Sequence, residues 1–445
     1  MKPLKLLSIY ITIFSFSVAS LAFSGNSLAA QLNDEEQKIV QHIDQNNQQA
    51  LVLLEKVVNI NSGTMNFSGV SKVGKLFNTE FQALGFKTQW IDGHDFNRAG
   101  HLIASYTENK NNSGKKNKLL LIGHLDTVFT KESAFQKFTI IDKQHVSGPG
   151  ITDMKGGDVV IISALKALKA AGVLDGLQIK VIMTGDEEKR GTPYKLATKE
   201  LIAAGKWADV ALGFEDGDGD AKTAVIARRG ATGWQLSVKG RAAHSSQIFR
   251  EKYGDGAIFE AARILNSFRT TLAKQPNLTF NPGLIVGGTN VELNAVQATA
   301  KGAGKSNVIA QSTIVSGDIR ALSPKQLIKA KAVMQNITEK NLAQTSAALE
   351  FFDGYPPMAP SAGNQTLLTM YSQVSVDLGL GKVIAVDPQK AGAADISFVA
   401  NDVDMALDGL GLMGVGGHTI KEVADISTLS SQTKRAALLM YRLSQ

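Results

Sequence analysis

An apolar run ends in a His-x-Asp motif at Leu119-Leu120-Leu121-Ile122-Gly123-His124-Leu125-Asp126-Thr127. The run has the length and composition of a buried strand. His124 and Asp126 are two residues apart, so their side chains share one face where the chain is extended. An imidazole beside a carboxylate is typical of a metal ligand whose second ring nitrogen is oriented by a neighbour. By itself the motif is only a weak indication of a metal site.

Strands and helices alternate on both sides of this motif. Further apolar strands are expected at 102–106, 179–183 and 210–214, and helices at 159–171 and 194–204. Alternation of this kind predicts an α/β fold, with a mixed, largely parallel sheet sandwiched by helices.

Residues 228–347 have a different order of elements. Strands are expected at 233–239, 278–286, 312–320 and 349–352, and helices at 256–272 and 324–342. The order β-α-β-β-α-β predicts a split-βαβ, ferredoxin-like domain. We expect it to be inserted into a larger domain formed by residues 31–227 and 348–445.

The composition excludes several classes of site. The 445 residues include no cysteine, which rules out disulfides, thiolate metal sites and cysteine nucleophiles. A metal ion would therefore be held by imidazole and carboxylate groups. The formal net charge of +7 is spread along the chain and forms no arginine-rich stripe, so we expect no nucleic-acid partner.

The first 30 residues have the features of a secretory signal peptide. Lys2 and Lys5 precede an apolar run, and Ser27-Leu28-Ala29 offers the small residues of a cleavage site. A membrane anchor is the alternative, since the run is nearly long enough to span a bilayer. The polar residues that follow favour cleavage, so we expect a periplasmic or secreted protein that does not bind a membrane after cleavage.

Four further motifs place polar groups at expected strand ends or in glycine-rich loops. Asp153 lies in Gly148-Pro149-Gly150-Ile151-Thr152-Asp153-Met154-Lys155-Gly156-Gly157, where a helix N-cap is the alternative interpretation. Glu187 and Glu188 follow one strand, and adjacent carboxylates there repel each other unless a cation is bound or the turn is solvated. Glu215 follows another strand, and His418 lies in Gly414-Val415-Gly416-Gly417-His418-Thr419.

The order His-x-Asp, Asp, Glu-Glu, Glu, His resembles that of the dinuclear zinc exopeptidase and aminoacylase family, which includes glutamate carboxypeptidases and succinyl-diaminopimelate desuccinylases. The resemblance covers nearly the whole chain after the signal peptide. It implies two zinc ions per subunit, one held by His124 and Glu215, the other by Glu188 and His418, and both by Asp153. It also implies that Asp126 orients His124 and that Glu187 is the general base.

The resemblance extends to the inserted domain, which corresponds to the family's lid and dimerisation domain. It implies a homodimer in which His244 reaches the partner's active site and stabilises the oxyanion. Asn307 and Arg320 match positions that grip the substrate, usually its carboxylate. Two positions depart from the family pattern. Ala310 replaces a common proline, and Tyr355 replaces the arginine that glutamate carboxypeptidases tend to carry.

The resemblance implies an exported, carboxypeptidase-like dizinc metallopeptidase that hydrolyses an amide or peptide bond next to a free carboxylate. An N-acyl amino acid amidohydrolase or a dipeptidase would use the same site, with a small peptide or N-acyl amino acid as substrate. A non-catalytic periplasmic binding protein on this fold is the alternative from another class. Glu187 and the five ligands are intact, which favours the enzyme. Lid and pocket contacts determine specificity in such a site, so the three hydrolytic activities remain open.

Overall fold

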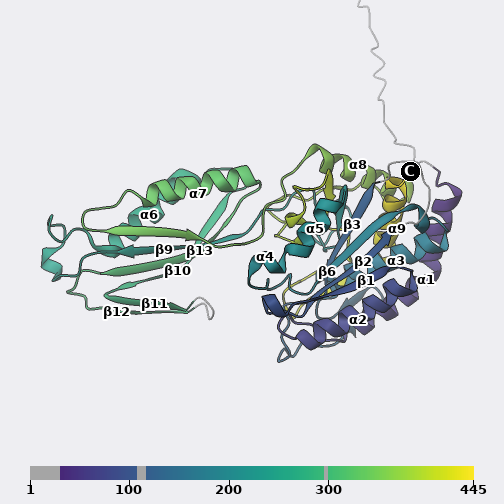
Figure 1. Cartoon of the computed structure of the whole chain (residues 1–445), viewed down its shortest axis with the longest axis horizontal. Helices are drawn as coiled ribbons and strands as arrows, with labels where there is room; N and C mark the ends of the chain where they lie inside the picture. Colours follow the sequence, from purple (N-terminus) through teal and green to yellow (C-terminus); the bar gives the residue numbers. More distant parts are fainter. Residues whose placement is uncertain (1–30, 108–116, 295–298) are drawn as a thin grey trace, which may run out of the picture.

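The computed structural model describes residues 31–107, 117–294 and 299–445. It consists of a larger α/β domain and an inserted domain that projects to one side (Figure 1). The signal peptide expected at residues 1–30 lies outside the described residues. Within the described ranges, no helix is both long enough and apolar enough to cross a bilayer.

A six-stranded sheet forms the centre of the larger domain and confirms the predicted mixed, largely parallel architecture. β1 and β2 pair antiparallel, as do β2 and β6, whereas the β6–β3, β3–β7 and β7–β16 pairs are parallel. The strands, in spatial order, are β1 (Lys87–Asp92), β2 (Gly100–Thr107), β6 (Gln178–Thr184), β3 (Lys118–His124), β7 (Val210–Gly213) and β16 (Met405–Leu407).

Helices cover both faces of this sheet. In β3, Leu119 and Leu121 pack into the main hydrophobic core beneath α1, α2, α3 and α9, whereas Leu120 and Ile122 pack on the opposite face with α5. The strand is therefore buried on both sides, which explains its unbroken apolar sequence. The helices of this domain are α1 (Asp34–Val58), α2 (Phe67–Ala83), α3 (Gly156–Ala170), α4 (Tyr194–Ala197), α5 (Lys199–Trp207), α8 (Ala362–Asp377) and α9 (Ser427–Leu443).

Side-chain caps determine where several helices begin. Asn33 and Glu36 form a capping box at the start of α1, because the Asn33 side chain accepts from the Glu36 N–H at 2.8 Å. Ser361 caps α8 in a similar way. The prediction of a single helix at 194–204 is wrong, because the structure has two separate helices, α4 and α5, which meet at Thr198.

The inserted domain has its own antiparallel sheet and hydrophobic core. Its order β9-α6-β10-β13-α7-β14 is the predicted βαββαβ order, and Trp234 and Phe268 are buried between the sheet and the helices. β14 runs past residue 347, where the inserted domain was expected to end. The elements are β9 (Thr232–Lys239), α6 (Gly256–Leu272), β10 (Thr279–Gly288), β13 (Ser312–Arg320), α7 (Pro324–Thr338) and β14 (Ser346–Phe351), plus a hairpin of β11 (Asn290–Asn294) and β12 (Thr299–Ala303) that the sequence reading missed.

The two connections between the domains lie side by side and are hydrogen-bonded. Arg228 and Met358 exchange main-chain hydrogen bonds of 2.9 and 3.0 Å, and the Ala231 N–H donates to the Tyr355 carbonyl at 2.9 Å. The inserted domain therefore leaves and re-enters the larger domain at one place.

A small four-stranded sheet, also missed from sequence, positions two loops beside the central sheet. It has the order β17-β18-β5-β4, and its strands are β17 (Gly414–Val415), β18 (Val423–Asp425), β5 (His145–Ser147) and β4 (Thr139–Ile140). A separate parallel pair joins β8 (Thr223–Ala224) to β15 (Ile384–Ala385). Because β5 and β18 are adjacent, the loop after β5 lies against the turn before β18.

Candidate metal centre

Three neighbouring strands of the central sheet bring polar side chains to one edge. β3 ends at His124, β6 is followed by Glu187 and Glu188, and β7 is followed by Glu215. The order β6-β3-β7 is parallel throughout, so these residues meet at the carboxyl ends of the strands. Ligand sites of open α/β sheets lie at this edge.

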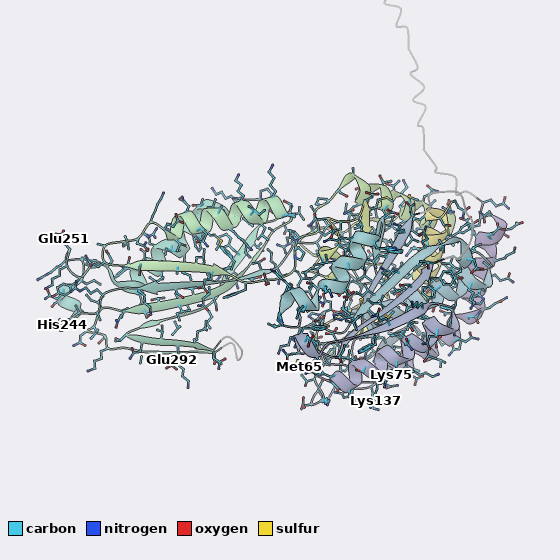
Figure 2. The ribbon with its side chains drawn as sticks, in the orientation of Figure 1. Met65, Lys75, Lys137, His244, Glu251 and Glu292 are labelled. Carbon is cyan, nitrogen blue, oxygen red and sulfur yellow. The ribbon has the colours of Figure 1, made fainter. Side chains whose placement is uncertain are left out.

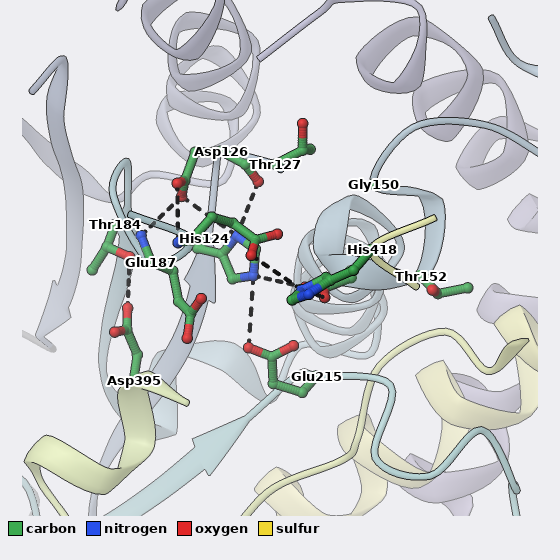
Figure 3. Close-up of polar contacts among 12 residues, drawn as sticks. His124, Asp126, Thr127, Gly150, Thr152, Thr184, Glu187, Glu215, Asp395 and His418 are labelled. Atoms are coloured by element: carbon green, nitrogen blue, oxygen red, sulfur yellow. Dashed lines mark hydrogen bonds and ion pairs between the residues drawn. The ribbon is translucent and has the colours of Figure 1, made fainter. Parts of the chain in front are cut away.

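Asp153 lies between the two histidines. Its Oδ1 is 3.0 Å from His124 Nε2, and its Oδ2 is 2.9 Å from His418 Nε2. Figure 3 shows the two histidines side by side in the cluster. It belongs to a short turn, η2 (Ile151–Lys155), with non-helical torsion angles, and α3 starts only at Gly156. The alternative interpretation as a helix N-cap is therefore wrong.

His418 reaches the cluster from the loop between β17 and β18. Its Nε2 is 3.1 Å from Glu188 Oε2 as well as 2.9 Å from Asp153. Its φ of +64° lies in the left-handed region, which is uncommon for a residue with a side chain. Strained torsion angles of this kind cluster at functional sites. The side chain is 59% exposed, so the cluster opens to solvent on this side.

The predicted ligands form two groups of donors that could each hold a metal ion, and both groups contain Asp153. One group is His124, Asp153 and Glu215, and the other is Asp153, Glu188 and His418. The donor atoms in each group lie within 4.8 Å of one another. Two donors bound to one zinc ion lie roughly 3.4 Å apart, given metal–ligand distances of about 2.1 Å and tetrahedral angles. The contacts of 2.9 to 3.6 Å fit this spacing.

The electrostatics of the cluster also fit a bound cation. Burial and the nearby Asp153 raise the pKa of Glu188 to about 7, and burial raises the pKa of Glu215 well above its ordinary value. Burial also opposes ionisation of Asp153, but its contacts with the two histidines lower its pKa. In addition, the buried Glu188 Oε1 has no hydrogen-bond partner among the described residues. Three close carboxylates with one open acceptor atom are what a pair of divalent cations would satisfy.

Asp126 is fully buried and holds the neighbouring backbone. Its Oδ1 accepts from the Glu187 N–H at 3.0 Å, and its Oδ2 accepts from the Glu188 N–H at 3.2 Å and from the Thr64 hydroxyl at 2.6 Å. His124 Nδ1 lies 3.0 Å from the Asp126 main-chain carbonyl and 3.5 Å from its carboxylate. The residue thus contacts His124 as expected, with its main chain closer than its carboxylate.

Glu187 lies beside the donor cluster but belongs to neither of the two donor groups. Burial raises the pKa of its carboxyl well above the ordinary value, and His124, Asp395 and Glu188 all interact with it electrostatically. Figure 3 draws no contact between its carboxylate and the other residues shown. A buried carboxylate that belongs to neither donor group is free of a ligand role, and a general base must also come within hydrogen-bond reach of the proton that it takes.

The sequence did not predict a buried arginine, Arg190, that is linked to the Glu187 backbone through Tyr355. Arg190 forms ion pairs with Asp186, at 2.5 Å, and with Asp395, and it donates to the Tyr355 hydroxyl at 2.8 Å. That hydroxyl in turn donates to the Glu187 carbonyl at 2.6 Å. Tyr355, noted from sequence only as a departure, therefore connects the domain junction to the backbone of Glu187.

The predicted residues of the inserted domain lie apart from this cluster. Figure 2 places His244 at the end of the inserted domain that is farthest from the larger domain, and the Ser245 N–H bonds the Asn307 carbonyl there at 2.9 Å. Arg320 pairs with Asp318 at 2.9 Å and is 40% exposed. Among the described residues, no hydrogen bond or ion pair joins His244, Asn307 or Arg320 to the metal-binding donors.

A cavity of about 550 Å³ adjoins the donor cluster at Glu188. Thr64, Met65 and Asn66 line it from the loop before α2, and Thr127 and Lys131 line it from the segment after β3. Its volume falls in the range of small-molecule sites.

Comparisons with known proteins identify the family to which this sequence is similar. Residues 120–442 match the model of a family described as Peptidase family M20/M25/M40. Carboxypeptidase G2 of Pseudomonas sp. (strain RS-16) is 26% identical to this chain over 430 residues, which is 96% of each protein.

Solved structures of low identity share the fold. Aminopeptidase PepT from Bacillus cereus superposes with a TM-score of 0.71 at 18% identity, over 90% of this chain and 99% of that one. An M20 family metallo-carboxypeptidase from Sulfolobus solfataricus gives a TM-score of 0.65 at 16% identity, over 89% and 99% of the two chains.

Proposed function

The chain belongs to peptidase family M20/M25/M40, and we propose that it is a dizinc, carboxypeptidase-like hydrolase that cleaves an amide or peptide bond next to a free carboxylate. The two donor groups that share Asp153 carry this proposal, because they offer two adjacent cation sites built from nitrogen and oxygen ligands alone. The full-length similarity to carboxypeptidase G2 supports the carboxypeptidase type. An N-acyl amino acid amidohydrolase and a dipeptidase are the neighbouring alternatives.

Glu187 transfers the proton in the proposed mechanism. When bound, the two zinc ions lower the pKa of a water molecule and polarise the scissile carbonyl. The Glu187 carboxylate takes a proton from the water as the new C–O bond forms, and gives it to the leaving nitrogen as the C–N bond breaks.

The cavity beside Glu188 is the proposed binding place for one half of the substrate. It opens next to the second donor group and is lined by the methyl-bearing Thr64, Met65 and Val128 and by the cation of Lys131. Arg320 lies at the junction end of the inserted domain and Asn307 at the far end, so in the proposed dimer Arg320 of one protomer and Asn307 of the other would hold the carboxylate half. Both residues carry groups that bind carboxylates.

Export is part of the proposed function. The signal peptide at residues 1–30 would direct the chain out of the cytoplasm, to the periplasm or the medium. N-terminal sequencing of the mature protein tests this point. A sequence that starts at Ala30 or Gln31 is expected, and one that starts at Met1 would contradict export.

A substrate screen with purified protein tests the reaction. N-acyl amino acids, dipeptides and folate-type glutamyl amides are incubated with the zinc-loaded enzyme, with the chelated enzyme and with Glu187→Gln. Zinc-dependent release of a free amino acid is expected, with a loss of at least ~10²-fold in kcat for Glu187→Gln at unchanged metal content. A fully active Glu187→Gln enzyme would refute the assigned base.

A further inference from the structure

Glu422 is a buried carboxylate that contacts the loop of the shared ligand. Its Oε2 accepts from the Gly150 N–H at 2.9 Å, and its Oε1 accepts from the Thr152 N–H at 2.9 Å and the Thr152 hydroxyl at 3.2 Å. Oε1 also lies 3.3 Å from the Asp153 N–H, which donates to it. The residue has no solvent exposure. Burial of a carboxylate is costly unless it is hydrogen-bonded, and these four donors offset that cost.

Glu422 connects the loop that carries Asp153 to the turn that carries His418. It lies four residues after His418, at the end of the turn between β17 and β18, and its main-chain carbonyl accepts from the Ser147 hydroxyl of β5 at 2.9 Å. Its side chain then reaches into the loop that leads from β5 to Asp153. One residue therefore contacts the loop of the shared ligand while its own turn carries His418.

The turn that contains Asp153 is closed by a main-chain hydrogen bond from the Lys155 N–H to the Gly150 carbonyl at 2.9 Å, which leaves the N–H groups of Thr152 and Asp153 to other acceptors. Asp153 and Met154 have non-helical torsion angles. Lys155, the N-cap residue of α3, makes no side-chain hydrogen bond that would cap the helix. The free N–H groups of such a turn need outside acceptors, and Glu422 supplies one from a distant part of the chain. On the other side of the turn, the buried Lys155 ammonium donates to the Ile60 carbonyl at 2.9 Å.

We propose that Glu422 is a positioning residue that sets the distance between Asp153 and His418, and thereby the affinity of the site for its second metal ion. The inference rests on the proposed dinuclear site and adds a residue outside the five predicted ligands. Neighbours that orient metal ligands typically contribute 10- to 100-fold to metal affinity. Glu422 touches neither the predicted substrate cavity nor the carboxylate of Glu187, so its effect passes through the two ligand loops.

The test compares Glu422→Gln with Glu36→Gln. Glu36 is also a buried glutamate that accepts a backbone N–H at the start of a helix, but it lies at α1, where it pairs with Arg442. Zinc affinities are measured against a competing chelator, and the absorption spectrum of the cobalt(II)-loaded protein reports ligand geometry. The melting temperature of the metal-free protein reports the fold.

We expect Glu422→Gln to weaken the binding of one zinc ion by about 10- to 100-fold and to change the cobalt spectrum. Glu36→Gln is expected to lower the melting temperature and leave both metal affinities unchanged. If Glu422→Gln does not fold, Glu422→Asp keeps the charge on a shorter side chain, and intermediate affinity is expected. Wild-type zinc affinities and spectrum in a folded Glu422 variant would overturn the inference.

These readouts separate this inference from the proposed function. Wild-type protein that binds no zinc would refute the dinuclear site itself. Wild-type protein that binds two zinc ions, with a Glu422 variant that also binds both normally, would refute only the role of Glu422.

Discussion

Asp126 fixes three parts of the site with one buried carboxylate. It holds the backbone of Glu187 and Glu188 and the hydroxyl of Thr64, while its main chain contacts His124. The proposed general base, Glu187, and one predicted ligand of each donor group therefore depend on the same residue. A side chain that acts in this way positions the reacting groups without touching the substrate.

Asp126→Asn replaces one oxygen by an amide NH₂ that faces N–H donors. Because a buried donor then lacks its acceptor, we expect a loss of about 1–3 kcal/mol in the free energy of unfolding of the metal-free protein. Denaturant unfolding measures it. Asp142→Asn is the matched control, since Asp142 also accepts two backbone N–H groups but at an exposed position, and a change within about 0.5 kcal/mol is expected. Equal effects of the two substitutions would contradict the role of Asp126.

Single residues of the site differ in how far the sequence could predict them. The ligands were predictable because each follows an apolar strand or lies in a glycine-rich loop, and the resemblance then assigned their roles. Glu422, Arg190 and Asp395 were not, because no local pattern marks a carboxylate or guanidinium whose partners lie far along the chain.

At the scale of elements, the long strands and helices were predictable and the short ones were not. β3, β6 and α9 carry enough residues for hydrophobic periodicity to show. The strands of the small sheet have two or three residues each, which is too short for any pattern, yet this sheet brings the Asp153 loop against the His418 turn. The break between α4 and α5 at Thr198 likewise leaves no mark in the hydrophobic periodicity.

The segment after β6 is held in place by Arg190. Its guanidinium lies between the buried Asp186 and Asp395 and against the rings of Tyr355 and Phe398. Through this contact, η5 (Asp395–Phe398) and the domain junction are both tied to the strand end that carries Glu187.

Arg190→Met leaves two buried carboxylates without their counter-charge. We expect it to reduce the free energy of unfolding by about 3–5 kcal/mol, measured by denaturant unfolding. Arg320→Met removes the half-exposed pair with Asp318 and is expected to cost no more than about 1 kcal/mol. An Arg190→Met protein as stable as Arg320→Met would show that the buried pair does not hold this segment.

In the whole molecule, the predicted active-site residues lie in two separate places, one in each domain. All five predicted ligands and Glu187 belong to the larger domain, whereas His244 and Asn307 are exposed at the far end of the inserted domain. This separation supports the proposed homodimer, in which the inserted domain of one protomer serves the site of its partner.

Mixed dimers test that arrangement. His244→Ala and Glu187→Gln are each expected to be nearly inactive alone. In a mixed dimer, one site combines the intact Glu187 of one protomer with the intact His244 of the other. Statistical mixing at equal concentrations should restore about a quarter of wild-type kcat, provided that each dimer has two equivalent sites. A mixture no more active than its separate components, or a protein that is monomeric in solution, would contradict the dimer proposal.

The zinc stoichiometry of the wild-type protein and of three ligand variants tests whether Asp153 is shared by two metal sites. Metal-free protein is titrated with zinc by calorimetry, and bound metal is checked by elemental analysis. Two ions per chain are expected for wild type, one for Glu215→Ala and one for His418→Ala, because each side chain belongs to one donor group. Asp153→Ala should lose both tight sites, since Asp153 belongs to both groups. A single ion in wild type, or two tightly bound ions in Asp153→Ala, would contradict the shared dinuclear centre.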